Sequence, residues 1–357
     1  MPRVRNQRQF EIDQQRALEA ALSLLAENGA RGATLRSIAS HCGISLSKLV
    51  ALFPTKDALL ASCFESVVAR DIERLTRLLD EVESSGATKE VLPKFLWAWC
   101  GESGGNRRAD SQALLEVFLT AMSNPEHSEL CKTWLLAYRD SLRELGSRIK
   151  VPANAMDVLG FQLLAERSFM ISCAGSATYQ IVAEAGLNLA CDRYLGLNRL
   201  PFDAGMSDVV SRFLIDVVAQ QNIQTPLTRG EETKQRIIDA AAAIVESDGL
   251  SAVTNRAVAE QAGISLALTT YHFDSVSDLA FAGMLALFER INSGSRVSDN
   301  PIHISDEIGG LLNRSKQPKG VGRLVDDISE ISLAASRGRA TEEMALALRQ
   351  QVGSVTF

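Results

Sequence analysis

Apolar residues recur every three or four positions along most of this chain, with polar residues between them, which is the pattern of amphipathic helices. Two examples are Leu18, Ala21, Leu22 and Leu25, and Ile238, Ala241, Ile244 and Val245. Further helical patterns cover residues 57–84, 88–100, 110–122, 126–148, 155–190 and 206–222, and shorter ones lie near 303–315, 321–336 and 341–352. We find no β-rich stretch, so the sequence predicts an all-α protein.

One part of this pattern occurs twice. Residues 21–60 align with residues 241–280 without a gap, and eleven of the forty positions are identical. In the first copy these are Ala21, Gly29, Thr34, Arg36, Ala39, Gly43, Ile44, Ser45, Leu46, Phe53 and Leu59. Because the identities concentrate at glycines and core positions, they indicate a repeated domain and not two generic helices that agree by chance.

Each copy predicts three helices separated by glycine turns. In the first copy Gly29 ends a helix, Thr34 caps the next one, and Gly43 makes a second tight turn before a third helix. Ala39 lies four residues before Gly43, where two crossing helices leave little room for a side chain. These are the features of a helix-turn-helix, although plain αα-hairpins share some of them. The duplication favours the helix-turn-helix.

The two segments resemble the N-terminal domain of the TetR family of bacterial transcriptional regulators. They read "ALEAALSLLAENGARGATLRSIASHCGISLSKLVALFPTKDALL" at 17–60 and "IIDAAAAIVESDGLSAVTNRAVAEQAGISLALTTYHFDSVSDL" at 237–279. The resemblance implies a homodimer that binds a double-stranded DNA operator. It also implies a repressor that releases the operator when a small-molecule effector, unidentified here, enters a larger helical domain.

With this resemblance, the chain divides into two three-helix domains, a full helical ligand and dimerisation domain after the first, and a short helical tail after the second. The expected boundaries are 1–68 and 231–290 for the helix-turn-helix domains, 69–222 for the ligand domain, 223–230 for a linker and 291–357 for the tail. The tail is too short for a second ligand domain. We therefore expect that it cannot supply the interface that a pseudo-dimer within one chain needs.

The resemblance also assigns DNA contacts by position. In the first copy Thr34 and Arg36 begin a helix beside a phosphate, residues 45–52 form the recognition helix, and Lys56 contacts the DNA backbone. The candidate residues are Thr34, Arg36, Ser45, Leu46, Ser47, Lys48, Val50, Ala51 and Lys56, followed by Thr254, Arg256, Ser265, Thr269, Thr270, Tyr271 and His272 in the second copy.

Both copies depart from the family pattern. The first keeps Lys56 but lacks the aromatic residues usual near the end of the recognition helix. The second keeps Tyr271 and His272, but Val276 replaces the phosphate-binding lysine and Thr269 replaces an aliphatic anchor. Each copy is therefore only partly equipped to bind DNA.

Charge separates the copies further. Residues 1–70 hold nine Lys/Arg and six Asp/Glu, a net +3, with Arg3, Arg5 and Arg8 expected on a flexible arm or a solvated terminus. Residues 226–290 hold five Lys/Arg and nine Asp/Glu, a net −4. Since phosphate attraction supplies much of the affinity of such modules, we expect the first copy to bind DNA more tightly.

The segment between the copies contains most of the aromatic residues. Trp97, Trp99, Trp134, Phe95, Phe118, Phe161 and Phe169 lie there, and we interpret them as core. If a pocket exists, its lining favours an apolar or aromatic effector, with Arg107, Arg108 or Arg139 as polar contacts. By the resemblance, the helices near 155–190 and 206–222 form the dimer interface.

The remaining composition narrows the class. The formal net charge is −6, so DNA contacts must come from local basic surfaces, and the six cysteines show no zinc spacing. Apolar runs are shorter than a membrane span, so we expect a soluble cytoplasmic protein. The four histidines are scattered and no catalytic arrangement appears, so we expect neither an enzyme nor a cofactor or metal. The competing hypothesis is a degenerate family member that no longer binds DNA and works through protein contacts or ligand sensing.

Overall fold

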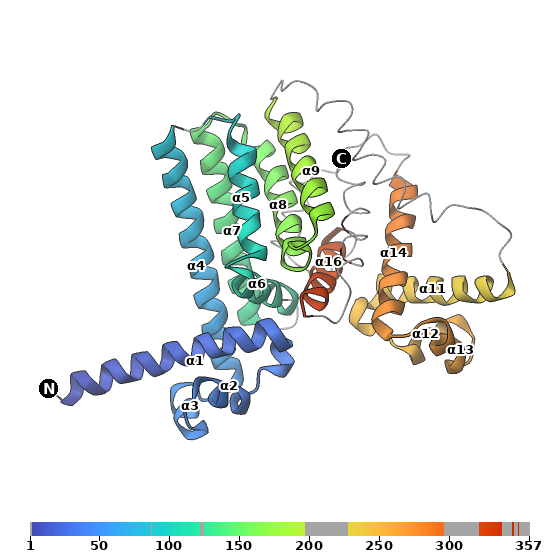
Figure 1. The fold of residues 1–357 in the computed structure, drawn as a ribbon, viewed down its shortest axis with the longest axis horizontal. Helices are drawn as coiled ribbons and strands as arrows, with labels where there is room; N and C mark the ends of the chain where they lie inside the picture. The colour runs from blue at the N-terminus through green and yellow to red at the C-terminus, as the bar shows by residue number, and fades with distance from the viewer. Residues whose placement is uncertain are drawn as a thin grey trace.

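The computed structural model describes residues 2–86, 88–121, 125–196, 228–295 and 321–337, together with Ala345 and Arg349. All regular structure in these residues is helical, which confirms the all-α prediction. Figure 1 shows two small helical units at the lower end of the molecule and a bundle of longer helices above the first of them. We call the units the first head and the second head, and the bundle the middle domain.

The first head is built from α1 (Pro2–Gly32), α2 (Leu35–Cys42) and α3 (Leu46–Leu52). Its core is formed by small and aliphatic residues that are fully or almost fully buried, among them Ala21, Leu25, Ile38 and Leu49. α4 (Lys56–Ser85) packs against α1 and continues into the middle domain, so one helix joins the head to the bundle.

The N-terminal basic residues lie in a helix. Arg3, Arg5 and Arg8 were expected on a flexible arm, but they belong to α1, whose first half projects from the head in Figure 1. Phe10 and Ile12 on this projecting part are 47% and 44% exposed.

The second head repeats the arrangement with α11 (Arg229–Asp248), a short 3-10 helix η1 (Leu250–Ala252), α12 (Asn255–Ala262) and α13 (Leu266–His272). α14 (Val276–Ser295) closes it, packed along α11. The two helices approach so closely that a Cβ on Gly283 would lie 2.7 Å from Cβ of Ala241. The head begins at the Thr228 cap, and residues 223–227 of the expected linker lie outside the described residues.

The middle domain contains α5 (Leu92–Gly104), α6 (Arg108–Thr120), α7 (Pro125–Arg148), α8 (Ala153–Cys173) and α9 (Ala177–Leu195), together with α4. The single helix expected over 155–190 is two helices, because Ser176 caps α9 by accepting a hydrogen bond of 3.2 Å from the backbone N–H of Tyr179. α6 lies at the lower end of the bundle and packs across α1 of the first head.

The aromatic residues of the middle domain are core residues, as expected. Trp99, Trp134, Phe118 and Phe169 are each at most 4% exposed, and the remaining three pack against the same clusters. All six cysteines are buried, and this burial raises the pKa of the Cys63 and Cys100 thiols to about 12.

The C-terminal segment returns to the middle domain. α16 (Val321–Ser336) packs against α8 and α6 and buries Ile328, Ile331 and Leu333. Arg349 is also buried and forms an ion pair with Glu166 of α8. The tail expected to be too short to form an interface therefore packs into the core of the middle domain. Apart from Ala345 and Arg349, the helices expected at 206–222, 303–315 and 341–352 lie outside the described residues.

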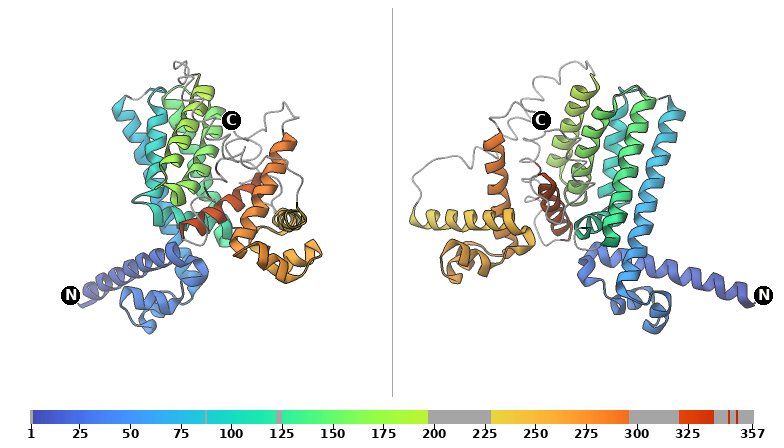
Figure 2. Two further views of the ribbon diagram at one scale, coloured as in Figure 1. Left: turned by 45° about the vertical axis from the view of Figure 1, so that its right-hand side comes forward. Right: turned by 180° about the vertical axis from the view of Figure 1, so that it is seen from behind.

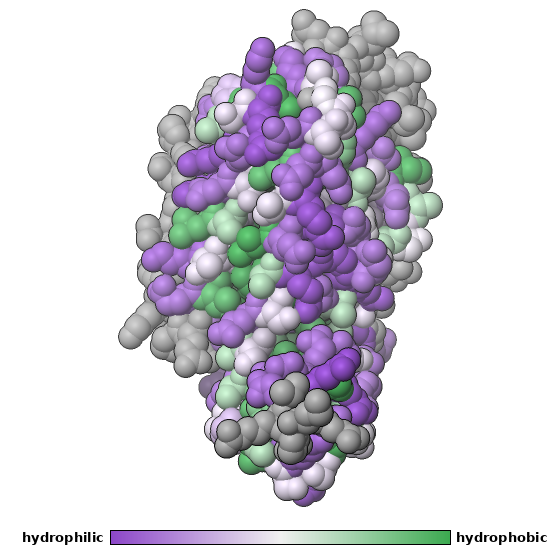
Figure 3. Space-filling model, turned by 90° about the vertical axis from the view of Figure 1, so that its left-hand side faces the viewer, coloured by the Kyte–Doolittle hydropathy of each residue, from purple (hydrophilic) through white to green (hydrophobic). Residues whose placement is uncertain are grey.

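Views from other sides show the same layout. In Figure 2 both heads stay at the lower end, and α16 lies between the middle domain and α14. The side of the molecule seen in Figure 3 is mostly hydrophilic, with smaller hydrophobic areas between the polar ones. Among the described helices, none combines the length and apolar character needed to cross a bilayer.

Candidate nucleic-acid interface

The two recognition helices present the same face. In α3 only Leu49 is buried, and in α13 only Thr269, at the equivalent position 220 residues later. The first three residues of each helix and the two that follow the buried one are exposed, and the last is partly exposed. Each helix is therefore held to its head by one side chain and leaves most of its surface open to a partner.

The turn before each recognition helix is also duplicated. Gly43 has φ 68° and ψ 31°, and Gly263 has φ 64° and ψ 41°. Because of this left-handed conformation, the backbone N–H of the residue after the glycine donates a hydrogen bond to the carbonyl of the small residue where the helices cross. The N–O distance is 3.1 Å from Ile44 to Ala39 and 3.0 Å from Ile264 to Ala259. Glycine is required because a Cβ is disfavoured at such dihedral angles.

An arginine fixes this turn to the first helix in both heads. Arg16 Nη2 donates to the carbonyl of Cys42 at 2.7 Å, and Arg236 Nη2 donates to the carbonyl of Ala262 at 2.8 Å. The pair lies at the same offset of 220 as the rest of the repeat. Sequence reasoning missed both arginines because the alignment began five residues after them.

The candidate residues of the first head lie on its open side. Thr34 caps α2 by accepting from the backbone N–H of Ser37, and Ser45 caps α3 by accepting from that of Lys48. Arg36 is exposed beside the first cap, and Lys56 is the first residue of α4, where it is partly exposed. The remaining candidates, Leu46, Ser47, Lys48, Val50 and Ala51, are exposed on α3.

The second head brings most of its candidates to the same places. Thr254 caps α12, and Arg256, Ser265, Thr270 and Tyr271 are exposed, with Tyr271 reaching 80%. His272 is partly exposed, and its ring meets that of Tyr271 edge-on at 5.1 Å between centroids.

Thr269 is the exception. Its side chain is fully buried, and its hydroxyl donates to the carbonyl of Leu266 at 2.7 Å. The prediction that Thr269 contacts DNA is therefore wrong, because its position is that of the hydrophobic anchor Leu49 in the first head. The hydroxyl is accommodated by bonding back to its own helix.

A charged pair distinguishes the first head. Lys48 of the recognition helix forms an ion pair with Asp13 of α1, whose side chain is almost fully buried. The hydrogen bond from Lys48, supported by Gln9, outweighs the effect of burial and holds the pKa of Asp13 below its usual value. Lys48 therefore shares its charge with a carboxylate of its own domain.

The second head lacks cations at both equivalent positions. Leu268 stands where the first head has Lys48, and Val276 stands where it has Lys56. Both aliphatic side chains are exposed, at 39% and 38%. The open face of α13 is consequently more apolar and less positive than that of α3.

The middle domain contains a buried charged group that sequence reasoning did not find. Arg167 binds Asp71 through both terminal nitrogens, at 2.7 and 3.2 Å, and its guanidinium lies 4.7 Å from the ring centroid of Trp99. Trp134 Nε1 also donates to Asp71, at 2.7 Å. Burial alone would raise the pKa of Asp71, but Arg167 and these hydrogen bonds hold it below its usual value.

The three arginines named as polar contacts for an effector are engaged elsewhere. Arg107 pairs with Asp110, Arg108 donates to the backbone of Ser336, and Arg139 pairs with its neighbour Asp140. The buried groups that meet in the middle domain come from α4, α5, α7 and α8. Their signal in the sequence is a charge inside an apolar helical pattern.

The fold and the heads agree with comparisons to known proteins. The family model described as "Bacterial regulatory proteins, tetR family" matches residues 17–63 and again residues 237–282. The chain therefore contains two TetR-type domains. The two matches coincide with the two heads.

Similar proteins include regulators from several bacteria. The chain is 25% identical over 131 residues to an HTH-type nicotine-responsive transcriptional repressor, HdnoR, of Paenarthrobacter nicotinovorans, covering 37% of this chain and 66% of that protein. It is 27% identical over 116 residues to an uncharacterized HTH-type transcriptional regulator, YerO, of Bacillus subtilis (strain 168), covering 32% and 38%. The chain thus matches less than two thirds of the length of these relatives. A transcriptional regulator from Rhodococcus sp. Rha1 of known structure aligns with a TM-score of 0.43 at 23% identity, over 53% of this chain and 99% of that one.

Proposed function

We propose that the protein is a DNA-binding transcriptional repressor of the bacterial cytoplasm, released from its operator by a small apolar effector. The observation that carries this proposal is the recognition helix, which in both heads is anchored by one buried residue and open on the rest of its surface. A helix held in this way can enter the major groove while the preceding helix lies across the backbone.

In this proposal the first head supplies most of the affinity. Thr34, Arg36 and Lys56 contact phosphates, and the exposed side chains of α3 read base edges. Lys48 contributes less than a free lysine because Asp13 neutralises part of its charge. The second head binds through Thr254, Arg256 and the residues of α13, but its net charge of −4 over 226–290 opposes the DNA backbone.

The salt dependence of DNA binding tests the phosphate contacts. Lys56→Ala in the full chain should lower the slope of log K against log salt by about 0.9, the value for one phosphate contact on B-DNA. Val276→Lys gives the second head a cation at the position equivalent to Lys56, and should raise the slope by a similar amount. Lys94→Ala on the exposed surface of α5, in the middle domain, is the control and should leave it unchanged.

A slope that does not respond to Lys56→Ala would remove Lys56 from the interface. Loss of all binding to plasmid DNA at low salt, by a folded chain, would overturn the whole proposal. It would favour the alternative, a degenerate member acting through protein contacts or ligand sensing, which the exposed Leu266, Leu268 and Tyr271 of the second head support.

The effector is proposed to bind within the middle domain. α6 packs on α1, so a change in the bundle has a direct route to the first head. The nicotine-responsive relative supports a small organic effector, and the tryptophans around Asp71 and Arg167 support an apolar or aromatic one. Coupling of about 1–3 kcal/mol is common for linked sites.

Tryptophan fluorescence tests this effector site, because Trp97, Trp99 and Trp134 all lie in the middle domain. A compound that changes the fluorescence should weaken operator binding by roughly 5- to 150-fold. A compound that changes the fluorescence and leaves operator affinity untouched would contradict effector release.

The homodimer implied by the family resemblance needs an exposed helical surface as its interface. The family interface was expected on helices near 155–190 and 206–222, and the second of these lies outside the described residues. α8, from the first, is covered by α16 of the same chain, whereas α9 leaves Ile181 54% exposed. A homodimer built on α8 would therefore have to displace α16, so we propose that a dimer, where it forms, uses α9.

A further inference from the structure

The two heads of one chain lie at the same end of the molecule. In Figure 1 the first head lies below the middle domain and the second head lies beside the lower end of that domain, with α3 and α13 on the lower sides of the heads. Both views of Figure 2 also place the two heads at the lower end of the molecule. Two recognition helices on one side of a single chain are the arrangement that a family dimer reaches with two subunits.

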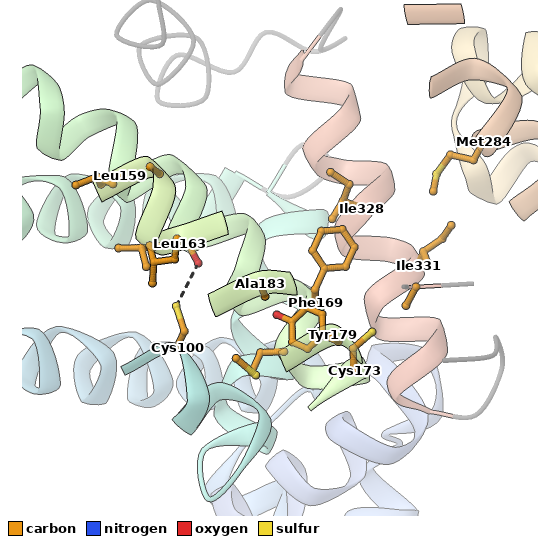
Figure 4. Packing of buried hydrophobic residues seen from close by; sticks show 14 of the residues in the cluster. Cys100, Leu159, Leu163, Phe169, Cys173, Tyr179, Ala183, Met284, Ile328 and Ile331 are labelled. Atoms are coloured by element: carbon orange, nitrogen blue, oxygen red, sulfur yellow. Dashed lines mark hydrogen bonds between the residues drawn. The ribbon is translucent and has the colours of Figure 1, made fainter. Parts of the chain in front are cut away.

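The helix that holds this arrangement together is α16. Its apolar residues contact α8 and α6, and Leu333 forms a buried cluster with Leu115 and Ile171. In Figure 4, Ile328 lies toward Phe169 of α8, on the side of α16 that faces the middle domain. α8 is therefore enclosed by helices of its own chain, including on the side covered by α16.

The end of α16 is bound to the middle domain by hydrogen bonds. Ser336 accepts from Arg108 through its carbonyl at 2.9 Å and from Gln112 through its hydroxyl at 2.8 Å. These two donors lie on the first turns of α6 and fix where α16 ends.

The next residue reaches the first head. Arg337 donates to the carbonyls of Leu25 and Ala26 near the end of α1, both at 2.9 Å, and pairs with Glu116 of α6 at 2.6 Å. Its side chain is only 7% exposed. A cation at the carbonyl end of a helix is favourably placed, so this contact ties the C-terminal segment to the first head.

The other side of α16 faces the second head. Ile331 in Figure 4 extends toward Met284 of α14, and the two residues belong to one buried cluster with Ile328. A continuous path of packed residues thus runs from the second head through α14 and α16 to the middle domain and the first head.

We infer that one chain binds one operator by itself, with the two heads on two unlike half-sites and with α14 and α16 in the place of a second subunit. This inference rests on the proposed DNA binding. The half-sites differ because the two recognition helices share only Leu46 and Leu266 among seven aligned positions. The family dimer, by contrast, repeats one recognition helix.

The first experiment selects duplexes from a random pool with the full chain and measures the stoichiometry of the selected complex by sedimentation. A chain that is monomeric when free and forms a complex of one chain with one duplex is the expected result. The enriched sequence should contain two half-sites that are not inverted copies of each other.

A matched pair of variants assigns the half-sites. Arg36 and Arg256 occupy equivalent exposed positions in the two heads. Arg36→Ala should remove hydroxyl-radical protection from one half-site and Arg256→Ala from the other. Each loses at most one phosphate contact, which corresponds to roughly an eightfold weaker complex at 0.1 M salt. Circular dichroism of both variants checks that the heads remain folded.

Three results would count against the inference, and they can be told apart. A palindromic operator bound by two chains, with Arg36→Ala weakening protection on both halves, would overturn it and leave the proposed function standing. If only one half-site is protected, and Arg256→Ala leaves that protection unchanged, the second head does not bind DNA. A folded chain that enriches no sequence would overturn the proposed function and this inference together.

Discussion

The two heads share a backbone and differ in surface. Both use a left-handed glycine before the recognition helix, a threonine cap on the helix before it, and an arginine that fixes the turn to the first helix. The cations Lys48 and Lys56 of the first head are aliphatic residues in the second. The elements that position a recognition helix are therefore separable from the charges on its exposed surface.

The anchor of the recognition helix should show the largest difference in stability. Leu49→Thr removes buried apolar surface and should lower the free energy of unfolding by about 2–4 kcal/mol, as large-to-small core changes do. Thr269→Val at the equivalent position removes a hydroxyl that bonds only to its own helix, and should change stability by less than about 1 kcal/mol. Urea unfolding of the full chain, with hydrogen exchange in each head, measures both.

Equal costs for these two substitutions would mean that the second head does not depend on its anchor as the first does. The reverse order, with Thr269→Val the more costly, would contradict the assignment of its hydroxyl to the Leu266 carbonyl alone.

The close packing of α14 against α11 in the second head should give the next largest effect on stability. Gly283→Ala would place a Cβ 2.8 Å from backbone atoms of Ala241 and Ala242, and overpacking of this kind costs about 1–3 kcal/mol. Gly230→Ala in the same head is a matched control, since no atom lies within 4 Å of the added Cβ. It should be neutral or stabilising by up to about 1 kcal/mol. Thermal unfolding measures the stability of both variants. An equal loss of stability in the two would contradict the prediction that only Gly283→Ala overpacks the helix pair.

Much of the fold was predictable because it depends on local signals. Gly43, Gly263 and the threonine caps follow from backbone chemistry that a short segment carries, so both heads were found from the sequence. The break between α8 and α9 was missed because an apolar pattern continues through the Ser176 cap. The docking of α16 was missed because nothing near residues 321–336 indicates which distant surface they cover.

The site was less predictable than the fold. The exposure of the recognition helices follows from their hydrophobic periodicity. The burial of Thr269 and the pairing of Lys48 with Asp13 depend instead on which face of each recognition helix packs against its own head. Thr269 was noted as an unusual anchor, and that pattern alone could have removed it from the DNA-binding residues. Asp13, Asp71 and Arg167 are brought to their partners by tertiary packing, which a single sequence does not encode locally.

The arginines that fix the two turns should contribute equally. Arg16→Ala and Arg236→Ala each remove one charge-assisted hydrogen bond to a backbone carbonyl, worth about 1–2 kcal/mol. Their effects should be additive in the double variant, because the two bonds lie in separate heads. Hydrogen exchange at Gly43 and Gly263 would locate each loss in its own head. Coupling between the two substitutions would instead mean that the heads unfold as one unit.

The smallest effect concerns pH and belongs to the first head alone. Lys48 holds the pKa of Asp13 below its usual value, so the stability from this pair is present above the unfolded pKa of about 3.9 and is lost as pH falls through the lower folded pKa. Lys48→Met should raise the pKa of Asp13 and move the acid unfolding of the first head to higher pH. The second head has Thr233 and Leu268 at these positions, so Leu268→Met should leave the acid unfolding of the second head unchanged. Carboxyl NMR titration of Asp13 measures the shift directly, and a pKa that does not respond to Lys48→Met would show that the pair contributes nothing in solution.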